Sequence, residues 1–342
     1  MAAKSKSKST PVETALVLPR HADIKETEVS SVELVDTHTH VASTFEAYRA
    51  KYPEGAHTTI KSFVKALLMS DETNKLSAVV DVWCEAPLKA EWLETVDSLG
   101  ELKEEGLSYS FVVGAHPHEA KEYTDELEET FKKAHAHPLC VGWGEIGLDY
   151  HYDNSPREIQ QAVLRRQLRT ALASGLGKAI TIHTREADDD IYTILTEELP
   201  KEQRIHVHCF TDSLEVAVKL LDHFPNLYIG ITGVITYSSN LNTSQVVRHL
   251  GEKATPSSPS ALRLVLETDA PYMLPSTMGP PSSFGMTSKQ KLPFAHSAVL
   301  PWTAAFVAKV LNEREMPEGE APWTTEDVLR VARENARKVY GV

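Results

Sequence analysis

Residues 179–210 read AITIHTREADDDIYTILTEELPKEQRIHVHCF. This stretch contains a short β-branched run at 179–182, a segment of helix length, and a second β-branched run at 205–207. Strand-like runs that alternate with helical segments indicate a parallel sheet whose strands are joined by crossover helices. The stretch therefore predicts an α/β fold, and polar histidines stand where both of its strands end.

The same alternation repeats along the chain. Strand-like runs are expected at 32–36, 78–83, 110–114, 139–143, 179–182, 205–207, 227–231 and 262–266. Eight βα units make up a (β/α)8 TIM barrel, which is the fold that we predict. A doubly wound open sheet would produce the same alternation and is the competing interpretation.

Length and loop composition divide the chain further. It has 342 residues, enough for two ordinary domains or one large barrel. We expect residues 1–30 to be a flexible N-terminal tail with a basic, serine-rich start, and residues 31–342 to form a single barrel domain. Segments 255–260 and 274–291 are rich in Pro, Ser and Gly and are expected to be loops. The second follows the last strand, where a barrel places the rim of its active site.

Two helices carry clear end signals. Ser155 followed by Pro156 predicts the N-cap of a helix over 158–173. Thr324 predicts the N-cap of a helix that runs to Tyr340, with Gly341 as its stop.

Composition limits the classes of function. The chain carries 35 Lys and Arg against 48 Asp and Glu, a net charge of −13, which argues against the basic surface of a typical nucleic-acid binder. Its 3 cysteines lack a CxxC spacing, which favours a reducing compartment. There is no run of about 18 apolar residues and no secretory signal. We therefore expect a cytoplasmic protein, with the nucleus as the alternative, that is a monomer without a membrane partner.

Polar side chains gather where the apolar strands end. A His-x-His pattern follows the first strand, a glycine-flanked glutamate follows the fourth, and His or Asp follows the fifth, sixth and eighth. These residues are His38, His40, Glu145, His183, His208 and Asp269. Each alone has a plain structural explanation, such as a hydrogen-bonded core histidine or a solvated glutamate in a turn. In a barrel, the carboxyl ends of all strands open on one face, so the six side chains would converge there.

Four imidazoles and two carboxylates suit one or two divalent ions such as Mg, Mn, Zn or Co. Two ions about 3.5 to 4 Å apart need a bridging ligand, and Glu145 is the central candidate. Such a centre lowers the pKa of a bound water and stabilises charge on the group under attack. The ligands therefore predict metal-dependent hydrolysis of a phosphoester or a carboxylester.

Six motifs, in order along the chain, carry a family resemblance. They are GAHPH at 114–118, GEIGLD at 144–149, HCFT at 208–211, YIGITG at 228–233, ETDAPY at 267–272 and NARKVYG at 335–341. In these motifs the chain, from about residue 31 onward, resembles the TatD family of metal-dependent deoxyribonucleases, which are amidohydrolase-like TIM barrels.

The resemblance implies a role for each position. One metal would be held by His38, His40, Glu145 and Asp269. The second would be held by Glu145, His183 and His208. Glu145 would then bridge two ions of Mg, Mn or Zn, and Asp269 would orient or deprotonate the nucleophilic water, which makes these two the expected catalytic residues.

Three further residues lie at the same rim or next to it. His116 and Arg185 are the candidates for contacts with substrate phosphate, since Arg presents a planar fork of donors. His116 has the alternative of a turn residue before Pro117. His206 alternates away from His208 and is expected to pack in the core.

Two segments depart from the family pattern. Residues 288–293 (SKQKLP) stand where the family commonly carries Arg and Asn before a Pro, and residues 41–77 form an insertion after the first strand. Both border the predicted cleft, so they leave the metal chemistry intact but the substrate open. Lys289 and Lys291 still give the first segment positive charge.

The main functional hypothesis is a nuclease that trims DNA from the 3′ end by attack of a metal-bound hydroxide on a phosphodiester. The alternative is a D-aminoacyl-tRNA deacylase that attacks the ester at the tRNA 3′ end with the same site, and a non-catalytic interaction scaffold is the third. Bound divalent ions would reverse the charge where the substrate enters. The net charge of −13 then predicts a weak, end-directed grip instead of excluding nucleic acid.

Overall fold

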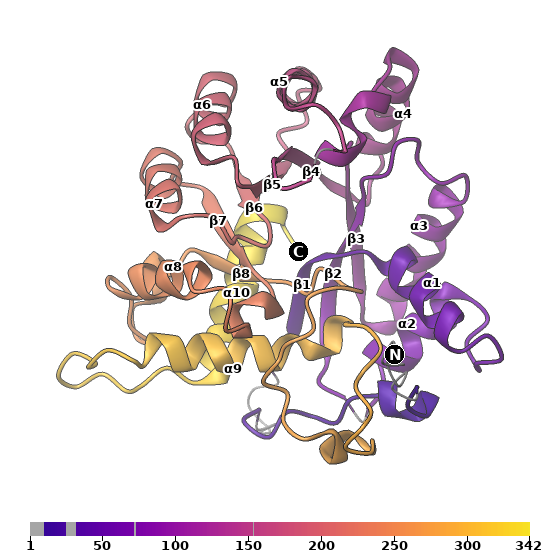
Figure 1. Ribbon diagram of the computed structural model, residues 1–342, viewed down its shortest axis with the longest axis vertical. Helices are drawn as coiled ribbons and strands as arrows, with labels where there is room; N and C mark the ends of the chain where they lie inside the picture. The colour runs from indigo at the N-terminus through magenta and orange to yellow at the C-terminus, as the bar shows by residue number, and fades with distance from the viewer. Residues whose placement is uncertain (1–9, 25–31, 72, 153) are drawn as a thin grey trace, which may run out of the picture.

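The computed structural model describes residues 10–24, 32–71, 73–152 and 154–342. These residues form eight parallel strands that pair in sequence order (Figure 1). The strands are β1 (Leu34–Thr39), β2 (Leu76–Trp83), β3 (Ser108–Val113), β4 (Cys140–Asp149), β5 (Ala179–Arg185), β6 (Ile205–Val207), β7 (Leu227–Ile231) and β8 (Leu264–Leu266). Each overlaps one of the ranges expected from the sequence.

The sheet closes into a barrel between its first and last strands. The backbone N–H of Asp269 donates to the carbonyl of His38 at 2.9 Å, and that of His40 donates to the carbonyl of Ala270 at 2.9 Å. A doubly wound sheet would have a permuted strand order and two open edges. The (β/α)8 prediction is therefore confirmed, and the competing interpretation is wrong.

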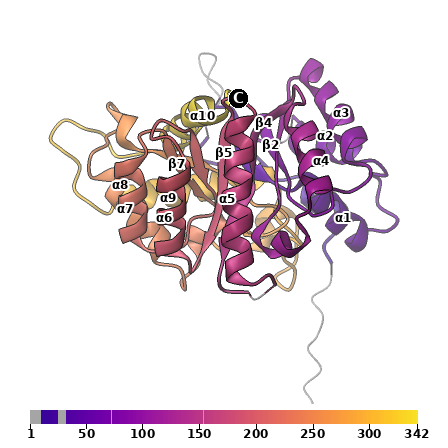
Figure 2. The same ribbon diagram turned by 90° about the horizontal axis from the view of Figure 1, so that it is seen from above.

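Most of the helices surround the strands on the outside of the barrel, whereas the last helix crosses one end of it and packs Val339 and Tyr340 against residues of several strands (Figure 1, Figure 2). The α-helices are α1 (Val41–Lys51), α2 (Ile60–Leu68), α3 (Trp92–Gly100), α4 (Asp125–His135), α5 (Arg157–Ala173), α6 (Asp188–Glu198), α7 (Leu214–His223), α8 (Asn242–Gly251), α9 (Leu300–Leu311) and α10 (Thr325–Tyr340). Short 3-10 turns lie at Glu13–Leu16, Glu101–Glu105, Pro117–Glu122, Gly233–Thr236, Pro259–Ala261, Pro281–Phe284 and Ser297–Val299. Helices α1 and α2 account for most of the predicted insertion at 41–77.

Apolar side chains fill the space between strands and helices. Trp83, Phe111 and Trp143, on the neighbouring strands β2, β3 and β4, are at most 1% exposed. Complete burial of a side chain such as Phe111 stabilises the folded state by about 1.5–3 kcal/mol. Helix α10 packs against β8 and β1, the two strands at the seam of the barrel.

The two predicted helix starts have different outcomes. Thr324 caps α10 through a reciprocal capping box with Asp327, and Gly341 ends the helix with a φ of 82°, as predicted. The Ser155 cap is wrong, because its hydroxyl donates to the carbonyl of His118 at 2.8 Å and accepts from the N–H of Lys121 at 3.1 Å. Ser155 therefore ties α5 to the loop after β3 instead of capping the helix.

Residues 10–24 correct the prediction of a flexible tail over 1–30. Leu16 and Leu18 are completely buried, and the Glu13 carboxylate accepts hydrogen bonds from the Tyr48 hydroxyl and the Ala56 N–H. The prediction of a flexible tail rested on the charged residues that follow the basic start, so it did not identify these apolar side chains. Residues 1–9 and 25–31, which include the basic start, lie outside the described residues. That residues 31–342 act as one domain stays a prediction.

Strands β4 and β5 run farther than expected. Gly147 pairs with His183 and Asp149 pairs with Arg185, so β4 ends at Asp149 and β5 at Arg185 instead of at 143 and 182. A Cβ atom at position 147 would lie 1.8 Å from the His183 carbonyl oxygen, so only glycine allows this approach. The glycines around Glu145 thus lie within β4 instead of after it.

The two predicted loops are irregular apart from short turns. Segment 274–291 contains the turn Pro281–Phe284 and lines an apolar cavity of about 490 Å³. Among the described residues, no helix is both long and apolar enough to cross a bilayer.

Candidate metal centre

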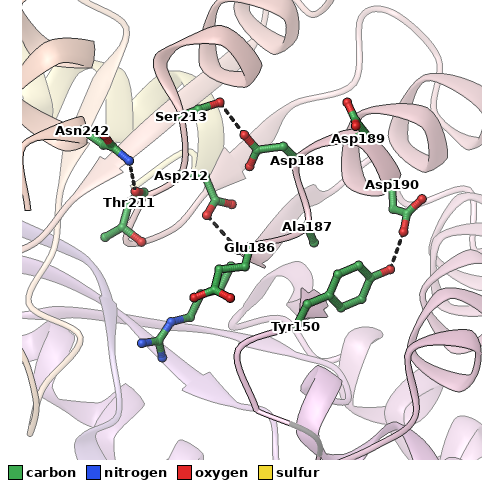
Figure 3. A pocket seen from close by; sticks show the side chains of 11 residues that line it. Tyr150, Glu186, Ala187, Asp188, Asp189, Asp190, Thr211, Asp212, Ser213 and Asn242 are labelled. Carbon is green, nitrogen blue, oxygen red and sulfur yellow. Dashed lines mark hydrogen bonds between the residues drawn. The ribbon is translucent and has the colours of Figure 1, made fainter.

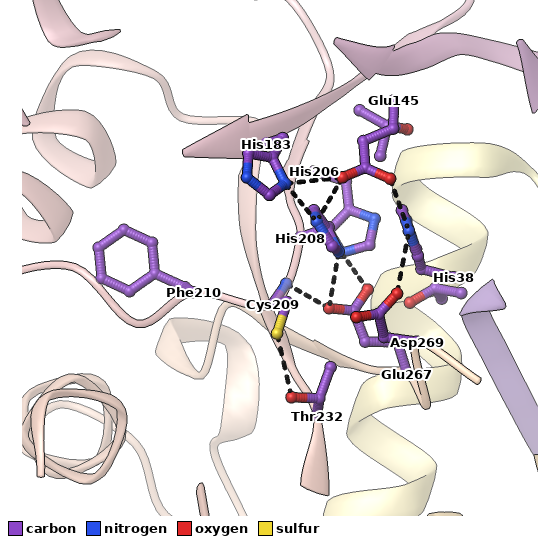
Figure 4. A network of polar contacts seen from close by, with 12 residues as sticks. His38, Glu145, His183, His206, His208, Cys209, Phe210, Thr232, Glu267 and Asp269 are labelled. Carbon is purple, nitrogen blue, oxygen red and sulfur yellow. Dashed lines mark hydrogen bonds and ion pairs between the residues drawn. The ribbon is translucent and has the colours of Figure 1, made fainter. Parts of the chain in front are cut away.

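All six predicted ligands meet at the carboxyl ends of the strands, and Figure 4 labels five of them, all but His40. β1 carries His38, with His40 directly after it, while β4 carries Glu145 and β5 carries His183. His208 follows β6 and Asp269 follows β8. The alternation of side chains along a strand explains why His38 and His40 point to the same place.

Glu145 lies at the centre of this group. Its Oε2 atom is 3.3 Å from His38 Nε2 and 3.9 Å from His40 Nε2. Its Oε1 atom is 2.7 Å from His183 Nδ1 and 2.8 Å from His208 Nε2. The two oxygens therefore face two different pairs of histidines, which is the arrangement that a bridging carboxylate requires.

Asp269 completes the first pair. Its Oδ1 atom is 3.3 Å from His40 Nε2 and 3.8 Å from His38 Nε2. The carbonyl of His38 accepts the Asp269 N–H, so the barrel seam itself places this carboxylate beside β1.

The donor atoms fit a divalent cation. Both ring nitrogens of His38 are buried without a hydrogen-bond partner in the described part of the chain, which is costly for an imidazole unless another group binds it. Cys84 Sγ lies 3.9 Å from Glu145 Oε2, but burial raises the pKa of this thiol well above its usual value, so it stays protonated. The centre thus offers imidazole and carboxylate ligands, which suit Zn, Mn and similar ions.

The histidines of the centre differ in their pKa values and therefore in their protonation states. Burial lowers the pKa of His38 to about 4 and that of His116 to about 4. Burial acts in the same direction on His40 and His183, but contacts with Asp269 and with Asp149 and Glu145, respectively, raise both pKa values to about 9. Burial also opposes ionisation of Glu145, yet His208 and His116 hold its pKa well below the usual range. Glu145 also raises the pKa of His208 against the effect of burial. Of the five imidazoles around Glu145 in the metal-free centre, His38 and His116 are therefore neutral, and His40 and His183 are protonated.

We expect the affinity of the metal-free protein for Mn²⁺ to rise between about pH 6 and about pH 8. His40 and His183 must each lose a proton to bind a cation, and pKa values of about 9 keep them protonated over this range. Each released proton makes affinity change by up to about tenfold per pH unit. Titration calorimetry in two buffers of different ionisation enthalpy measures affinity and proton release together. Affinity without pH dependence would contradict the assignment of these two residues as ligands.

Comparison with known proteins identifies the family. The family model described as TatD related DNase matches residues 35–341. The chain belongs to the TatD family. It is similar to the human 3′-5′ RNA nuclease TATDN2, with 34% identity over 243 residues, which are 71% of this chain and 28% of that protein. It is also similar to the 3′-5′ ssDNA/RNA exonuclease TatD of Pantoea ananatis, with 32% identity over 232 residues, which are 67% of this chain and 76% of that protein.

The bacterial relative is matched over most of its length, 76%, whereas the human relative is much longer than the matched part. Among solved structures, the TatD homologue YJJV from Escherichia coli superposes with a TM-score of 0.60 at 23% identity, covering 92% of this chain and 100% of that chain. This likeness supports the barrel fold.

The sequence predicted that His116 contacts the substrate, and the structure places it in contact with Glu145. His116 Nε2 lies 3.3 Å from Glu145 Oε1, the oxygen that also faces His183. Its Nδ1 accepts the backbone N–H of His118 at 3.1 Å, which fixes the ring with Nε2 toward the centre. The alternative of a turn residue also fits, because the same hydrogen bond makes His116 the N-cap of the turn Pro117–Glu122.

Two carboxylates beside the TatD-type centre were not assigned from the sequence. Asp149 Oδ2 is 2.8 Å from His118 Nε2 and 3.3 Å from His183 Nε2, so it holds the ring of His183 with Nδ1 toward Glu145. The available signal was spacing, since positions 145, 147 and 149 of one strand share a face.

Glu267 is the second of these carboxylates. Its Oε2 atom lies 2.9 Å from His206 Nε2, and its Oε1 accepts the N–H of Cys209. His206 is buried, as expected for packing, and its Nδ1 lies 2.8 Å from the Tyr340 hydroxyl, which in turn lies 2.6 Å from Thr181 Oγ1. Glu267, His206, Tyr340 and Thr181 thus form a buried polar network next to His208.

The Asp149→Asn variant is expected to bind Mn²⁺ about 10- to 100-fold more weakly, because the carboxylate that orients a metal-binding histidine is lost. Titration calorimetry measures the change. Asp190→Asn is the matched control, since Asp190 bonds to the Tyr150 hydroxyl at 2.7 Å, on helix α6 outside the centre. Equal affinities for both variants would contradict the role of Asp149.

A cavity of about 710 Å³ lies next to the centre, beyond the end of β5 (Figure 3). Arg185 is the one cation in its lining, and five carboxylates surround it: Glu186, Asp188, Asp189, Asp190 and Asp212. Three of these accept hydrogen bonds: Asp212 from the Glu186 N–H at 2.9 Å, Asp188 from the Ser213 hydroxyl, and Asp190 from the Tyr150 hydroxyl at 2.7 Å. Arg185 instead places its guanidinium 5.1 Å from the ring centroid of Tyr152.

Proposed function

We propose that this protein is a metal-dependent 3′-5′ exonuclease that acts on single-stranded DNA ends. The observation that carries the proposal is Glu145, whose two oxygens face different histidines within one buried centre. Oε2 faces His38 and His40, and Oε1 faces His116, His183 and His208. The names of the TatD relatives, which are a 3′-5′ RNA nuclease and a 3′-5′ ssDNA/RNA exonuclease, support the substrate class and the polarity.

The centre would hold two divalent ions of Mg, Mn or Zn. His38, His40 and Asp269 would hold one ion together with Glu145 Oε2, and His183 and His208 would hold the other with Oε1. When bound, the ions lower the pKa of a coordinated water and neutralise charge on the phosphodiester. The orientation of His116 Nε2 toward Glu145 favours a ligand role for His116 over the phosphate contact expected from the sequence.

The remaining steps belong to side chains of this chain. Burial alone would raise the pKa of Asp269, but its hydrogen bond with His40 and the positive charge of His40 lower it. Asp269 is therefore ionised and able to accept a proton from the attacking water. Arg185, at the end of β5, would bind a phosphate oxygen of the substrate.

The acidic cavity beyond Arg185 favours action at a chain end. A strand that continued through this cavity would bring its phosphates against the five carboxylates of the lining, which repel them. A terminal nucleotide avoids this repulsion, so we propose exonucleolytic cleavage. We further propose that the protein acts as a monomer in the cytoplasm or the nucleus.

Wild-type protein is expected to shorten single-stranded DNA with added Mn²⁺ or Mg²⁺, and excess EDTA is expected to abolish cleavage, because the histidines and Glu145 alone cannot activate water. Gel analysis of labelled oligonucleotides measures the products and their polarity. Cleavage that persists in EDTA, or no cleavage with any divalent metal, would contradict the proposal.

The same preparation separates the alternative activities. D-aminoacyl-tRNA is tested in parallel, because a centre of this kind can also attack a carboxylester. Faster release of the amino acid than of nucleotides would favour the deacylase. Absence of both activities in metal-loaded protein would favour the interaction scaffold.

A further inference from the structure

The exposed aromatic side chains of the described residues are confined to the mouth of the barrel. Eight large hydrophobic side chains are exposed in this part of the chain, and the only aromatic ones are Tyr152, which is 48% exposed, and Tyr272, which is 59% exposed. Exposing a tyrosine ring to water loses the stabilisation that burial would give. Two such rings at one site therefore suggest a ligand that covers them.

Tyr152 stands on the β4–β5 side of the centre. Its ring contacts that of His118, with centroids 5.6 Å apart, and the His118 ring lies 4.4 Å from that of His116, which faces Glu145. The guanidinium of Arg185 rests over the same tyrosine at 5.1 Å. An aromatic surface and a phosphate-binding cation thus lie side by side.

Tyr272 stands on the opposite side, beside β8 and β1. Its backbone N–H donates to the carbonyl of Asp269 at 2.9 Å, so the turn that carries the Asp269 carboxylate also carries this ring. Tyr272 therefore follows β8 at the carboxyl end of the barrel, three residues after Asp269, and its ring is exposed there.

We propose that Tyr152 and Tyr272 each stack one nucleobase, on opposite sides of the phosphodiester that is cleaved. The inference rests on the proposed nuclease function and assigns it a substrate unit, a terminal pair of nucleotides whose bases are both unpaired. A ring can stack on any base, because every base has a π-face, so the two sites do not select sequence. Bases paired in a duplex cannot cover both rings, so a recessed or blunt duplex end is a poor substrate.

Kinetics with two kinds of phosphodiester test the proposal. Tyr152→Ala and Tyr272→Ala are each expected to raise KM for a single-stranded oligonucleotide by about 5- to 150-fold, the range for loss of one stacked base. The same variants are expected to leave hydrolysis of an oligomer made only of abasic residues, which has no aromatic ring, within about twofold of wild type. Tyr152→Phe and Tyr272→Phe keep the ring and are expected to retain the wild-type KM.

Leu176→Ala is the matched control. Leu176 is also 48% exposed, but it precedes β5 and so lies at the opposite face of the barrel from the centre. Its substitution is expected to leave the kinetics with both substrates unchanged.

Oligonucleotides with an abasic residue assign each ring to one base. An abasic residue at the terminal or the next position is expected to raise KM of the wild type. It is expected to have no further effect in the alanine variant that has lost the matching tyrosine. Equal effects of the alanine variants on both kinds of phosphodiester, or no effect on the oligonucleotide, would overturn the stacking proposal.

Binding separates this inference from the proposed function. Fluorescence anisotropy of a labelled oligonucleotide in EDTA is expected to show weaker binding by the alanine variants and unchanged binding by the phenylalanine variants. If wild type cleaves neither phosphodiester with metal, the nuclease proposal fails, and the binding comparison alone decides the role of the tyrosines. Equal binding by wild type and alanine variants would then overturn it.

Discussion

The Glu145→Gln variant is expected to lose about 10³-fold or more of the nuclease activity, which corresponds to about 4 kcal/mol of transition-state stabilisation. Glutamine keeps the size of the side chain but removes the negative charge that two sets of histidines face. A neutral amide is a poor bridge between cations. The expected loss appears in kcat with single-stranded DNA and Mn²⁺.

Thermal unfolding shows whether the loss comes from metal binding. Metal that binds only the folded state raises the melting temperature of wild type, and this rise is expected to be absent in Glu145→Gln. Glu101→Gln serves as the control, since Glu101 is an exposed carboxylate that pairs with Lys61 at 2.5 Å outside the centre. A Glu145→Gln variant that kept both activity and the metal-induced rise would refute the bridging role.

The Asp269→Asn variant is expected to lower kcat by about 10²-fold or more, the contribution typical of a positioned general base. Asparagine keeps the shape of the side chain but cannot accept a proton from the attacking water. The loss is expected in kcat more than in KM, and the acidic limb of the pH–rate profile that reports ionisation of Asp269 is expected to disappear.

Initial rates over a range of substrate concentrations and pH measure these effects. Ser276→Ala, in the loop after β8, is a control whose hydroxyl bonds only to Thr236 among the described residues. If Asp269→Asn changed KM alone, Asp269 would be a substrate contact and not a base.

The sequence was sufficient for the barrel and for the convergence of the six candidate ligands. Their prediction needed only the alternation of strands and helices and the rule that strand carboxyl ends share a face, and His38, Glu145 and His208 lie where that rule places them. Both arguments use local patterns that survive folding unchanged.

Residues whose roles depend on distant partners could not be predicted in the same way. Asp149 and Glu267 act through contacts with His183 and His206 on other strands, and no local pattern distinguishes them from ordinary strand-end acids. The burial of Leu16 could not be predicted, because a short apolar stretch does not repeat often enough to show a period that indicates burial. The orientation of His116 depends on the turn that follows it.

The buried polar network next to His208 can form only after the last helix, α10, has been synthesised. Tyr340, which supports His206, belongs to α10, and α10 follows every strand of the barrel in the chain. Domains begin to fold while they are translated, amino-terminal parts first. A nascent chain that already holds all eight strands still lacks the hydroxyl that fixes His206, so the ribosome must release α10 before the site can reach its final arrangement.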